Sequence, residues 1–515
     1  MNHNAKQPTI DRDGEALSLW QTGNIDLPLV KTMADENTVY DTLIIGGGIT
    51  GITTALLLQQ AGQKCIIAEA HTLGFGSTSG TSAHLNTFFD ATYNEIEKDF
   101  GEDAAKLVAT SGKEALALIA QLAEEYQIAC DLEYKSAYLY SENKEESKQL
   151  REILESSKKA GVAAETTNTN GINVPFHSSI LFKDQGQFHP LKYILGLSSA
   201  FIAAGGIILE NTFIREVSFE EELHLASADD TRIRARNVVY ATHIPPGISQ
   251  FNFRCAAYRS YVLGIRLSDN NYPRELVYDM QEPYHYSRTH VIDGQEYLIL
   301  GGEDHKTGHE DPEQAFKNLE DYARQYYAVA SVDFKWSSQY YIPVDGLPYI
   351  GLSPGVDDRT YIATGFNGNG MIFGTLSAKI LSDLILGRDN PYARLFSPSR
   401  MKPVAGFMDF IKENADVAYH FITDRFSAED IDSLDELEPD SGRIVEYKNH
   451  RLAVYKDPEG KVWTLNPICT HAGCVVNFNA VEKSWDCPCH GGRFDCKGKV
   501  LTGPPRENLQ QIIPD

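Results

Sequence analysis

The sequence predicts an α/β domain of the Rossmann type that is followed by a small all-β domain at the C-terminal end. Two observations support this fold class. From Thr38, an apolar run of strand length, a glycine-rich turn, a helical pattern and a second strand follow one another, which is the order of a βαβ unit. From Arg443, short alternating runs are typical of β-hairpins. The 515 residues leave room for about three domains in all.

The charge of the chain limits its partners. The chain has 46 lysines and arginines against 71 aspartates and glutamates, so its formal net charge is −25. We expect no nucleic-acid partner, because phosphate binding relies on clustered Lys and Arg. Docking on an anionic membrane surface is disfavoured for the same reason.

The N-terminal segment and the isolated cysteines predict a cytoplasmic location. Residues 1–21 contain no basic segment followed by an apolar core, so we expect no secretory signal. The most apolar stretch, TLIIGGGITGITTALLLQQAG, is interrupted by Gly, Thr and Gln, and it predicts a buried strand, turn and helix rather than a membrane span. Cys65, Cys130 and Cys255 stand alone and are expected to be buried, reduced thiols.

The first βαβ unit carries a dinucleotide-binding fingerprint. Gly46, Gly48 and Gly51 occupy the glycine positions of G-x-G-x-x-G, and Glu69 ends the second strand. The first glycine permits the tight turn, the second lets the backbone approach a pyrophosphate, and the third lets the helix pack closely on the strand. The helix N-terminus then faces the anion, and Glu69 can accept a hydrogen bond from a ribose hydroxyl. The unit therefore predicts dinucleotide binding.

A second glycine-rich turn lies far downstream. The segment TYIATGFNGNGMIFGTLSAKILSDLILG predicts a strand, a turn and a helix from about Met371 to Leu386, with Gly368 and Gly370 in the turn. No acidic residue ends a following strand, so this turn does not complete a second fingerprint. We therefore do not expect NAD(P)H to be the reductant.

The segments between residues 41 and 400 resemble the FAD-dependent oxidoreductases of the D-amino-acid-oxidase (DAO) family, which includes glycine oxidase and sarcosine oxidase. The resemblance rests on LIIGGGITG, FGSTSG, DQGQFHPLKYILGLSSAFIAAGGIILENTFIREV, VVYATH, DGLPYIG and GFNGNGM, in the family's order. It implies FAD, bound by a Rossmann-like α/β FAD domain of about 41–95, 181–250 and 341–400. It also implies an α+β substrate domain of about 96–180 and 251–340.

The same resemblance implies which residues hold the flavin. The backbone at Ile214 is expected along the adenine, and the loop from Gly365 to Gly370 is expected to point a helix N-terminus at the flavin pyrimidine. A partial positive charge there would stabilise the anionic reduced flavin. Ser79, in FGSTSG, joins this expected FAD site. Covalent attachment of the flavin to His84 is disfavoured, because histidine-linked members of the family place that residue differently.

The family removes a hydride directly from its substrate, so we expect substrate-positioning groups rather than a strong base. Arg259 and Arg288 fall in the expected substrate domain and could hold a carboxylate bidentately. His285 and its neighbour Tyr286 are further candidates. The alternative, surface arginines and core aromatic residues without a role in catalysis, stays open.

Five of the eight cysteines gather near the C-terminal end, beside two histidines. The spacing is Cys469-x-His471, followed by Cys487-x-x-His490. Structural zinc sites favour Cys-x2–4-Cys and His-x3–5-His, which is a different pattern, and a plain disulfide framework would not need the histidines. The pattern CTHAGC, CPCHGG and GPP resembles the three loops of Rieske [2Fe–2S] proteins. The resemblance implies that Cys469 and Cys487 bind one iron and that His471 and His490 bind the other.

Further features of the C-terminal domain follow from the Rieske resemblance. It implies a disulfide between Cys474 and Cys489 that ties the cluster loops together, and a loop at Gly503-Pro504-Pro505 that covers the cluster. Cys496 has no counterpart in the family and is expected to be a free thiol.

Two positions depart from the high-potential Rieske proteins. Gly492 stands where those proteins usually have a serine, and Phe494 stands where they usually have a tyrosine. Both hydroxyls would donate hydrogen bonds to cluster sulfurs. Their loss predicts a lower reduction potential.

The expected domain order is an N-terminal arm at 1–40, the oxidoreductase at 41–400, a helix and acidic linker at 401–440 and the Rieske domain at 441–515. The helix is predicted from FMDFIKENADVAYHFITDRF, and the linker from the acidic run SAEDIDSLDELEPDSG.

Together the two halves predict a flavin-dependent dehydrogenase of an amine or amino acid. FAD accepts two electrons as a hydride and a Rieske cluster accepts one at a time, so we expect electrons to pass from FAD to the cluster and on to an external one-electron acceptor. A Rieske oxygenase is disfavoured, because its mononuclear iron domain follows the cluster and only nineteen residues follow Cys496. A redox sensor or electron-transfer protein without amine turnover stays open as the alternative.

Overall fold

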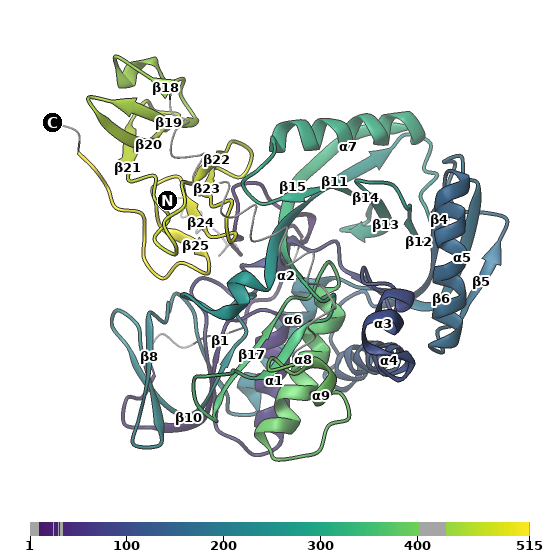
Figure 1. Cartoon of the computed structure of the whole chain (residues 1–515), viewed down its shortest axis with the longest axis horizontal. Coiled ribbons are helices and arrows are strands. Elements are labelled where there is room, and N and C mark those ends of the chain that lie inside the picture. The colour runs from purple at the N-terminus through teal and green to yellow at the C-terminus, as the bar shows by residue number, and fades with distance from the viewer. Residues whose placement is uncertain (1–9, 24, 29, 31–33, 401–428, 514–515) are drawn as a thin grey trace, which may run out of the picture.

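The computed structural model describes residues 10–23, 25–28, 30, 34–400 and 429–513. These residues form two large sheets with their helices, and two small sheets at the C-terminal end (Figure 1). The helix predicted from FMDFIKENADVAYHFITDRF lies outside the described residues. Among the described helices, none combines the length and the hydropathy that a bilayer crossing requires.

The first large sheet is the Rossmann-like one. Its main described strands run in the order β16 (Tyr349–Leu352), β17 (Thr360–Thr364), β10 (Arg232–Tyr240), β1 (Val39–Ile45), β2 (Cys65–Ala68) and β7 (Ile207–Leu209), with β9 (Leu223–Ser227) and β8 (Glu216–Glu220) beside β10. Strand β1 pairs in parallel with β2 and β10. Its residues from Thr42 to Ile45 are all buried, as expected for a central strand.

Three helices form a layer on the first sheet. They are α1 (Ile49–Gln60), α6 (Pro190–Ala203) and α8 (Gly370–Ile385), with α1 packed between the other two. Helix α1 directly follows β1, so the β1–α1–β2 connection is the βαβ unit that the sequence predicts. The N-terminal ends of α1 and α8 lie at the carboxyl ends of β1 and β17, which is where open α/β sheets bind ligands.

The second large sheet is antiparallel over most of its width. Its main described strands run in the order β15 (Val329–Pro343), β11 (Cys255–Leu267), β14 (Gln295–Lys306), β13 (His285–Ile292), β12 (Leu276–Tyr278), β4 (Glu133–Ser141), β6 (Ser178–Gln187) and β3 (His84–Leu85), with β5 (Ala164–Thr167) beside β6. In the β11–β15 register, Ser260 is opposite Ser338. Alternation along β15 then puts Tyr340 on the same face as these two serines.

Four longer helices cover the second sheet and its edges. They are α3 (Tyr93–Phe100), α4 (Glu102–Glu125), α5 (Lys144–Lys159) and α7 (Pro312–Tyr326). Helix α7 packs on β11 and β14, and α5 packs on β4, β5 and β6. The start of α5 follows from its sequence, because the Asn143 side chain accepts hydrogen bonds from the backbone N–H groups of Glu145 and Glu146.

The C-terminal domain consists of two small sheets. The first contains β18 (Glu429–Asp430), β19 (Ser441–Tyr447), β20 (His450–Lys456) and β21 (Val462–Leu465), and the second contains β22 (Asn477–Asn479), β23 (Ser484–Asp486), β24 (Arg493–Asp495) and β25 (Val500–Thr502). Strand β18 pairs with β19, so this sheet begins before the predicted boundary at residue 441.

The N-terminal arm is built into the core of the protein. Leu19 and Trp20 are fully buried, and the indole N–H of Trp20 donates a hydrogen bond of 2.5 Å to the carbonyl oxygen of Thr81. The backbone N–H of Asp13 donates to the carbonyl oxygen of Phe75, which is close to the fingerprint helix. The described part of the arm therefore packs against the FAD-domain segment.

Six buried charged residues join the arm, the second sheet and the C-terminal domain. They are Arg12, Asp13, Arg259, Glu482, Asp486 and Arg493, all at most 5% exposed. Both oxygens of the Glu482 carboxylate accept hydrogen bonds from Arg12, at 3.0 and 3.1 Å. Arg493 forms ion pairs with Asp13 at 2.8 Å and with Asp486 at 2.9 Å. Three positive and three negative groups balance, as burial of charge requires.

Candidate functional site

A cavity of about 600 Å³ lies between the two large sheets and the C-terminal domain. It brings together six residues that the sequence predicts for FAD: Gly46, Gly48, Glu69, Ile214, Gly368 and Gly370. Two helices begin at the cavity, since Gly48 is the N-cap of α1 and Gly370 is the first residue of α8. Both helix N-termini offer partial positive charge and backbone N–H groups to an anionic ligand.

The fingerprint turn leaves no room for side chains. Gly46 has a φ of +114°, and a Cβ atom there would lie 2.4 Å from the carbonyl oxygen of Ala241. A Cβ atom at Gly51 would lie 1.9 Å from the carbonyl oxygen of Gly46, so α1 packs directly on the turn. Gly51 therefore acts through packing, whereas Gly48 lines the cavity and exposes its backbone to a ligand. This geometry fits the pyrophosphate of FAD.

Glu69 follows β2 and also lines the cavity. Its Oε2 atom accepts a hydrogen bond of 2.6 Å from the backbone N–H of Gly47, and its Oε1 atom accepts one of 2.9 Å from that of His71. Burial raises the pKa of Glu69, and the two backbone donors oppose that shift. The carboxylate is thus fixed at the strand end, where it can accept from a ribose hydroxyl.

Besides Gly51, two predicted FAD residues lie outside the lining of the cavity. The Ser79 hydroxyl is buried and donates to the carbonyl oxygen of Gly76 within its own turn, at 3.2 Å. Gly365 packs against Pro343, which would lie 3.1 Å from a Cβ atom there. Within FGSTSG, the residues with hydroxyl groups that line the cavity are Ser77 and Thr78. The turn presents these neighbours because Ser79 points back into the helical turn.

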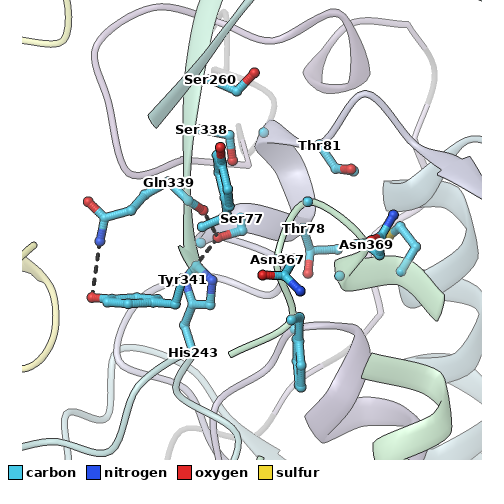
Figure 2. Close-up of a pocket in the computed structure, with 18 of the residues that line it drawn as sticks. Ser77, Thr78, Thr81, His243, Ser260, Ser338, Gln339, Tyr341, Asn367 and Asn369 are labelled. Carbon is cyan, nitrogen blue, oxygen red and sulfur yellow. Dashed lines mark hydrogen bonds between the residues drawn. The ribbon is translucent and has the colours of Figure 1, made fainter. Parts of the chain in front are cut away.

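One side of the cavity is formed by a hydrogen-bonded group of side chains (Figure 2). The Ser77 hydroxyl donates to the backbone carbonyl of Gln339 at 3.0 Å and lies 3.1 Å from Nδ1 of His243. The Gln339 side-chain amide donates to the Tyr341 hydroxyl at 3.1 Å. The rings of His243 and Tyr341 meet edge to face with centroids 4.7 Å apart. Burial lowers the pKa of His243 to about 4, so the imidazole is neutral.

The same two residues of β15 contact the predicted cluster loop. The Gln339 amide donates to the carbonyl oxygen of Gly491 at 2.9 Å, and the Tyr341 hydroxyl donates to that of His490 at 3.3 Å. Sequence analysis missed both residues. Their signal is the run SSQYYIP, in which Gln339 and Tyr341 occupy alternate positions and so share one face of the strand.

The C-terminal domain also lines the cavity directly, through Leu501, Thr502, Gly503 and Pro505. The carbonyl oxygen of Pro504 accepts a hydrogen bond of 2.8 Å from the backbone N–H of Gly247. A Cβ atom at Gly492 would lie 2.8 Å from Pro505 Cδ and 3.7 Å from Cys469 Sγ. The proline loop therefore lies between the predicted cluster ligands and the cavity.

The structure brings the four predicted cluster ligands together. The side chains of Cys469 and Cys487 are buried free thiols that hydrogen-bond each other, and this bond lowers the pKa of Cys469. The rings of His471 and His490 lie with centroids 4.9 Å apart. All four of their ring nitrogens are buried and lack a hydrogen-bond partner among the described residues. Two thiols and two imidazoles with free nitrogens fit a Rieske [2Fe–2S] cluster.

The predicted disulfide is present. Cys474 and Cys489 are bonded, with Cα atoms 6.5 Å apart. The Sγ atom of Cys487 lies within 4.8 Å of both disulfide sulfurs, so the bridge packs against a ligand loop. Cys496 is a free, half-buried thiol, as predicted.

Arg259 does not line the cavity. Its Nε donates to the Ser337 hydroxyl at 2.8 Å, and Nη2 lies 3.9 Å from the Glu482 carboxylate. It belongs to the buried charged group at the domain junction, beside Glu482, although its register partner Gln339 lines the cavity. A role in holding substrate therefore stays a prediction, without a contact that supports it.

The other two substrate-positioning candidates also lie outside the cavity lining. Nδ1 of His285 lies 2.8 Å from the Asp279 carboxylate, and its ring stacks on Tyr322 at 3.9 Å between centroids. Arg288 is fully buried and donates to the backbone carbonyls of Ala83 at 2.6 Å and of Phe188 at 3.2 Å. The side chains of His285 and Arg288 therefore contact other buried parts of the protein, and neither lines the cavity.

The neighbours of these residues do reach the cavity. Tyr286, with Tyr278 and Tyr284, lines it beside His84. Burial and the nearby Arg288 guanidinium lower the pKa of His84 to about 3. Covalent attachment of flavin to His84 stays a disfavoured hypothesis, and its neutral ring packs between Tyr278 and Tyr286.

Comparison with known proteins agrees with these two sites. A family model described as FAD dependent oxidoreductase (DAO) matches residues 41–384, and one described as Rieske [2Fe-2S] domain matches residues 428–513. YhfW of Bacillus subtilis (strain 168), a Rieske 2Fe-2S iron-sulfur protein by name, is 32% identical over 496 residues, which cover 96% of this chain and 97% of that protein.

More distant relatives match the oxidoreductase part. Gamma-glutamylputrescine oxidoreductase of Escherichia coli (strain K12) is 22% identical over 372 residues, which are 68% of this chain and 85% of that protein. Glycine oxidase from Geobacillus kaustophilus has a TM-score of 0.59 at 19% identity, and the match covers 70% of this chain and 99% of that one.

L-proline dehydrogenase from P. horikoshii has a TM-score of 0.58 at 18% identity, and the match covers 72% of this chain and 98% of that one. At these identities the structural likeness shows the fold. The family match spans most of the chain and includes the fingerprint, the β15 face and most of α8. The second match includes all four predicted cluster ligands. The chain therefore belongs to the FAD-dependent oxidoreductases of the DAO family, and it carries FAD together with a C-terminal Rieske [2Fe–2S] domain.

Proposed function

We propose that this protein is a dehydrogenase of an amine or amino acid that passes electrons from FAD through its own Rieske cluster to an external one-electron acceptor. The observation that carries the proposal is the shared wall between the two sites. Gln339, Tyr341 and Pro505 face the FAD cavity, and each also contacts the cluster loops. When bound, FAD supplies a hydride acceptor and the cluster supplies one-electron transfer.

The residues of this chain have separate tasks in that reaction. The fingerprint turn and the N-termini of α1 and α8 bind and orient the dinucleotide. Residues of the second sheet, among them Ser260, Tyr278 and Tyr286, enclose the space left for a substrate. The proline loop and Tyr341 keep water from the wall between the sites, because both are packed into it.

The names of relatives support an amine or amino-acid substrate. Gamma-glutamylputrescine oxidoreductase, glycine oxidase and L-proline dehydrogenase each name a compound with a C–N bond next to a C–H bond. Oxidation of such a bond removes a hydride from carbon and a proton from nitrogen, and leaves an imine. The external acceptor and the cytoplasmic location stay predictions from the sequence.

The test is anaerobic stopped flow with the purified holoprotein. An amine should bleach the flavin absorbance, and the cluster should then be reduced at a rate that does not depend on protein concentration. NADH should not bleach the flavin, because the chain has one dinucleotide fingerprint. A cluster-reduction rate proportional to protein concentration would reject transfer within the chain, and bleaching by NADH alone would reject the substrate class.

A variant separates the two halves of the proposal. His490→Cys should remove the Rieske spectrum and leave amine-dependent bleaching of the flavin intact, since His490 lies on the cluster side of the wall. Loss of both signals would mean that the two sites do not fold independently. If the wild-type protein has an intact cluster but no amine bleaches its flavin, the result would favour an electron-transfer or sensor protein.

A further inference from the structure

The described lining of the FAD cavity contains neither Lys nor Arg. Its charged residues are acidic: Asp13, Glu69, Asp90, Asp279 and Glu282. Proteins that recognise a carboxylate typically use a guanidinium, which donates two parallel hydrogen bonds to it. Arg259 Nε and Arg288 Nη1 donate to structural partners, and neither arginine that sequence analysis assigned to this task lines the cavity.

The histidines of the lining do not supply positive charge either. Burial is the largest cause that lowers the pKa of His84 to about 3 and the pKa values of His71 and His243 to about 4. All three imidazoles are therefore neutral near pH 7. The partial positive charge that remains in the cavity is that of the N-termini of α1 and α8. The fingerprint turn and the turn before α8 place both helix N-termini where the dinucleotide binds.

The substrate side of the cavity is instead a wall of tyrosines. Tyr278, Tyr284, Tyr286 and Tyr340 line it from the second sheet and the loop before β13. The ring of Tyr286 lies with its centroid 5.7 Å from that of Tyr284 and 6.5 Å from that of Tyr278. Burial raises the pKa of each tyrosine, so the rings are neutral. Neutral tyrosine faces attract cations within about 6 Å of the ring centroid.

Two carboxylates flank this wall. Asp90 lines the cavity, and its Oδ2 accepts a hydrogen bond of 2.6 Å from the backbone N–H of Gly368. Asp304 lies behind the wall and accepts a hydrogen bond of 2.8 Å from the Tyr340 hydroxyl. Burial, together with the nearby Asp90 charge, raises the pKa of Asp304 to about 7. Burial also raises the pKa of Asp90, and a cation bound beside its carboxylate would favour the charged form.

A hollow that adjoins the cavity has the same sign of charge. Glu282 lines both the cavity and an adjoining hollow, and that hollow is also lined by Glu303, Glu310 and Asp311. An acidic surface beside the cavity attracts cations and repels anions, which raises the encounter rate of cationic ligands.

We propose that the substrate is a cationic amine that carries no carboxylate, and that the tyrosine wall and Asp90 bind its ammonium group. This inference rests on the proposed function, because it narrows the substrate of that same site from amines and amino acids to amines alone. It is carried by a tyrosine wall and a carboxylate in a cavity whose described lining offers no cationic side chain.

The test compares compounds that differ only in a carboxylate. The pairs are phenethylamine and phenylalanine, putrescine and ornithine, and pyrrolidine and proline. Binding is measured anaerobically from the shift of the flavin spectrum, and reduction from its bleaching. Each amine should half-saturate at a concentration at least about tenfold lower than its amino acid, which corresponds to about 1.4 kcal/mol. Equal or tighter binding of the amino acids, or binding by no member of any pair, overturns the inference.

Binding and bleaching separate the two proposals. If amines bind preferentially but bleach no flavin, the oxidation proposed above fails while the inference on the ligand class stands. If amino acids bind preferentially and bleach the flavin, the proposed function stands and this inference fails, and the N-terminus of α8 becomes the carboxylate site.

Two variants locate the site. Asp90→Asn keeps an acceptor for Gly368 and removes the charge, so the amine concentration for half-saturation should rise at least about fivefold. Tyr286→Leu should raise it without any change of charge. Asp321→Asn, on the exposed face of α7, removes the same charge far from the cavity and should change nothing. Flavin content is measured for each variant. Wild-type amine affinity in both cavity variants, with normal flavin content, overturns the inference.

Discussion

The side-chain amide of Gln339 donates a hydrogen bond of 2.9 Å to the carbonyl oxygen of Gly491. Gln339 faces the FAD cavity, and Gly491 directly follows the predicted cluster ligand His490. A Cβ atom at Gly491 would lie 2.4 Å from Ala257 Cβ, so the loop presses against β11 as well. The cluster loop is thus held against the wall of the cavity by both a hydrogen bond and close packing.

Tyr341→Phe should slow electron transfer from the flavin site to the cluster. The variant removes the hydroxyl that donates to the His490 carbonyl and leaves the bond from Gln339 to Gly491 in place. Loss of a hydrogen bond worth about 1 kcal/mol should reduce the rate by up to about fivefold. Stopped flow should show this change in cluster reduction, with an unchanged rate of flavin bleaching by the amine.

Tyr349→Phe is the matched control for that measurement. Tyr349 is also a buried tyrosine, and its hydroxyl has no hydrogen-bond partner among the described residues. It does not line the cavity. Both rates should therefore equal those of the wild type. Equal cluster-reduction rates in Tyr341→Phe and Tyr349→Phe would show that the hydroxyl contact does not set the rate.

Gly48→Val should abolish FAD binding and leave the Rieske spectrum intact. A Cβ atom at Gly48 would lie 3.0 Å from Thr78 Oγ1, and the added methyl groups would fill the approach to the turn. Backbone contact with the pyrophosphate would then be blocked. Flavin content after denaturation and visible circular dichroism of the cluster measure the two sites separately. Retention of stoichiometric FAD would show that the pyrophosphate does not lie on this turn.

The sequence predicts the parts of these sites that lie in short, continuous motifs. The glycines of the fingerprint, Glu69 and the four cluster ligands are each fixed by local spacing, and the disulfide between Cys474 and Cys489 follows from the Rieske loops. Local geometry dictates those residue types, so the motif alone carries the prediction.

Contacts between distant segments could not be predicted in this way. Gln339 meets Gly491, and Arg12 meets Glu482, across 152 and 470 residues of sequence. Arg259 is an example, because its place in the expected substrate domain suggested a carboxylate ligand and no contact in the structure supports that role. Its register partner Gln339 lines the cavity whereas Arg259 lies beside Glu482, and neither propensity nor motif specifies which side chain reaches which site.

Phe494→Tyr should raise the reduction potential of the cluster. Phe494 is fully buried in the core of the C-terminal domain, two residues after Gly492. A new hydroxyl that reaches a cluster sulfur would stabilise the reduced, more negative state. The shift should be on the order of tens of millivolts, measured on the full chain by an EPR-monitored redox titration. Phe494→Leu adds no donor and serves as the control.

Gly492→Ser should raise the potential as well, at a cost in packing. Its Cβ atom would lie 3.7 Å from Cys469 Sγ, which brings the hydroxyl within reach of a ligand sulfur. The same Cβ atom would lie 2.8 Å from Pro505 Cδ, so the proline loop has to move. We therefore expect a higher potential together with slower electron transfer from the flavin site. A wild-type potential in this variant and in Phe494→Tyr would show that hydrogen bonds to sulfur do not set it here.

Acid should weaken the junction of the C-terminal domain through Glu482. Burial alone would raise the pKa of Glu482, but the Arg12 and Arg259 guanidinium groups outweigh it and lower the pKa from 4.5 to about 2. A carboxyl group whose pKa is lower in the folded state stabilises that state above its unfolded pKa. The stabilisation, about 3 kcal/mol for a shift of this size, is lost as the pH falls from about 4.5 to about 2.

Glu482→Gln should remove this pH dependence and destabilise the junction at pH 7. Two buried guanidinium groups, those of Arg12 and Arg259, would lose their counter-charge, which typically costs about 3–5 kcal/mol. The melting temperature of the Rieske circular dichroism signal should fall at pH 7, and it should change less than that of the wild type between pH 4.5 and pH 2. Glu165→Gln, in an exposed pair with Lys183, should change it little, because such surface pairs contribute about 0–1 kcal/mol. Equal melting temperatures of the two variants at pH 7 would mean that the buried charged group does not hold the domains together.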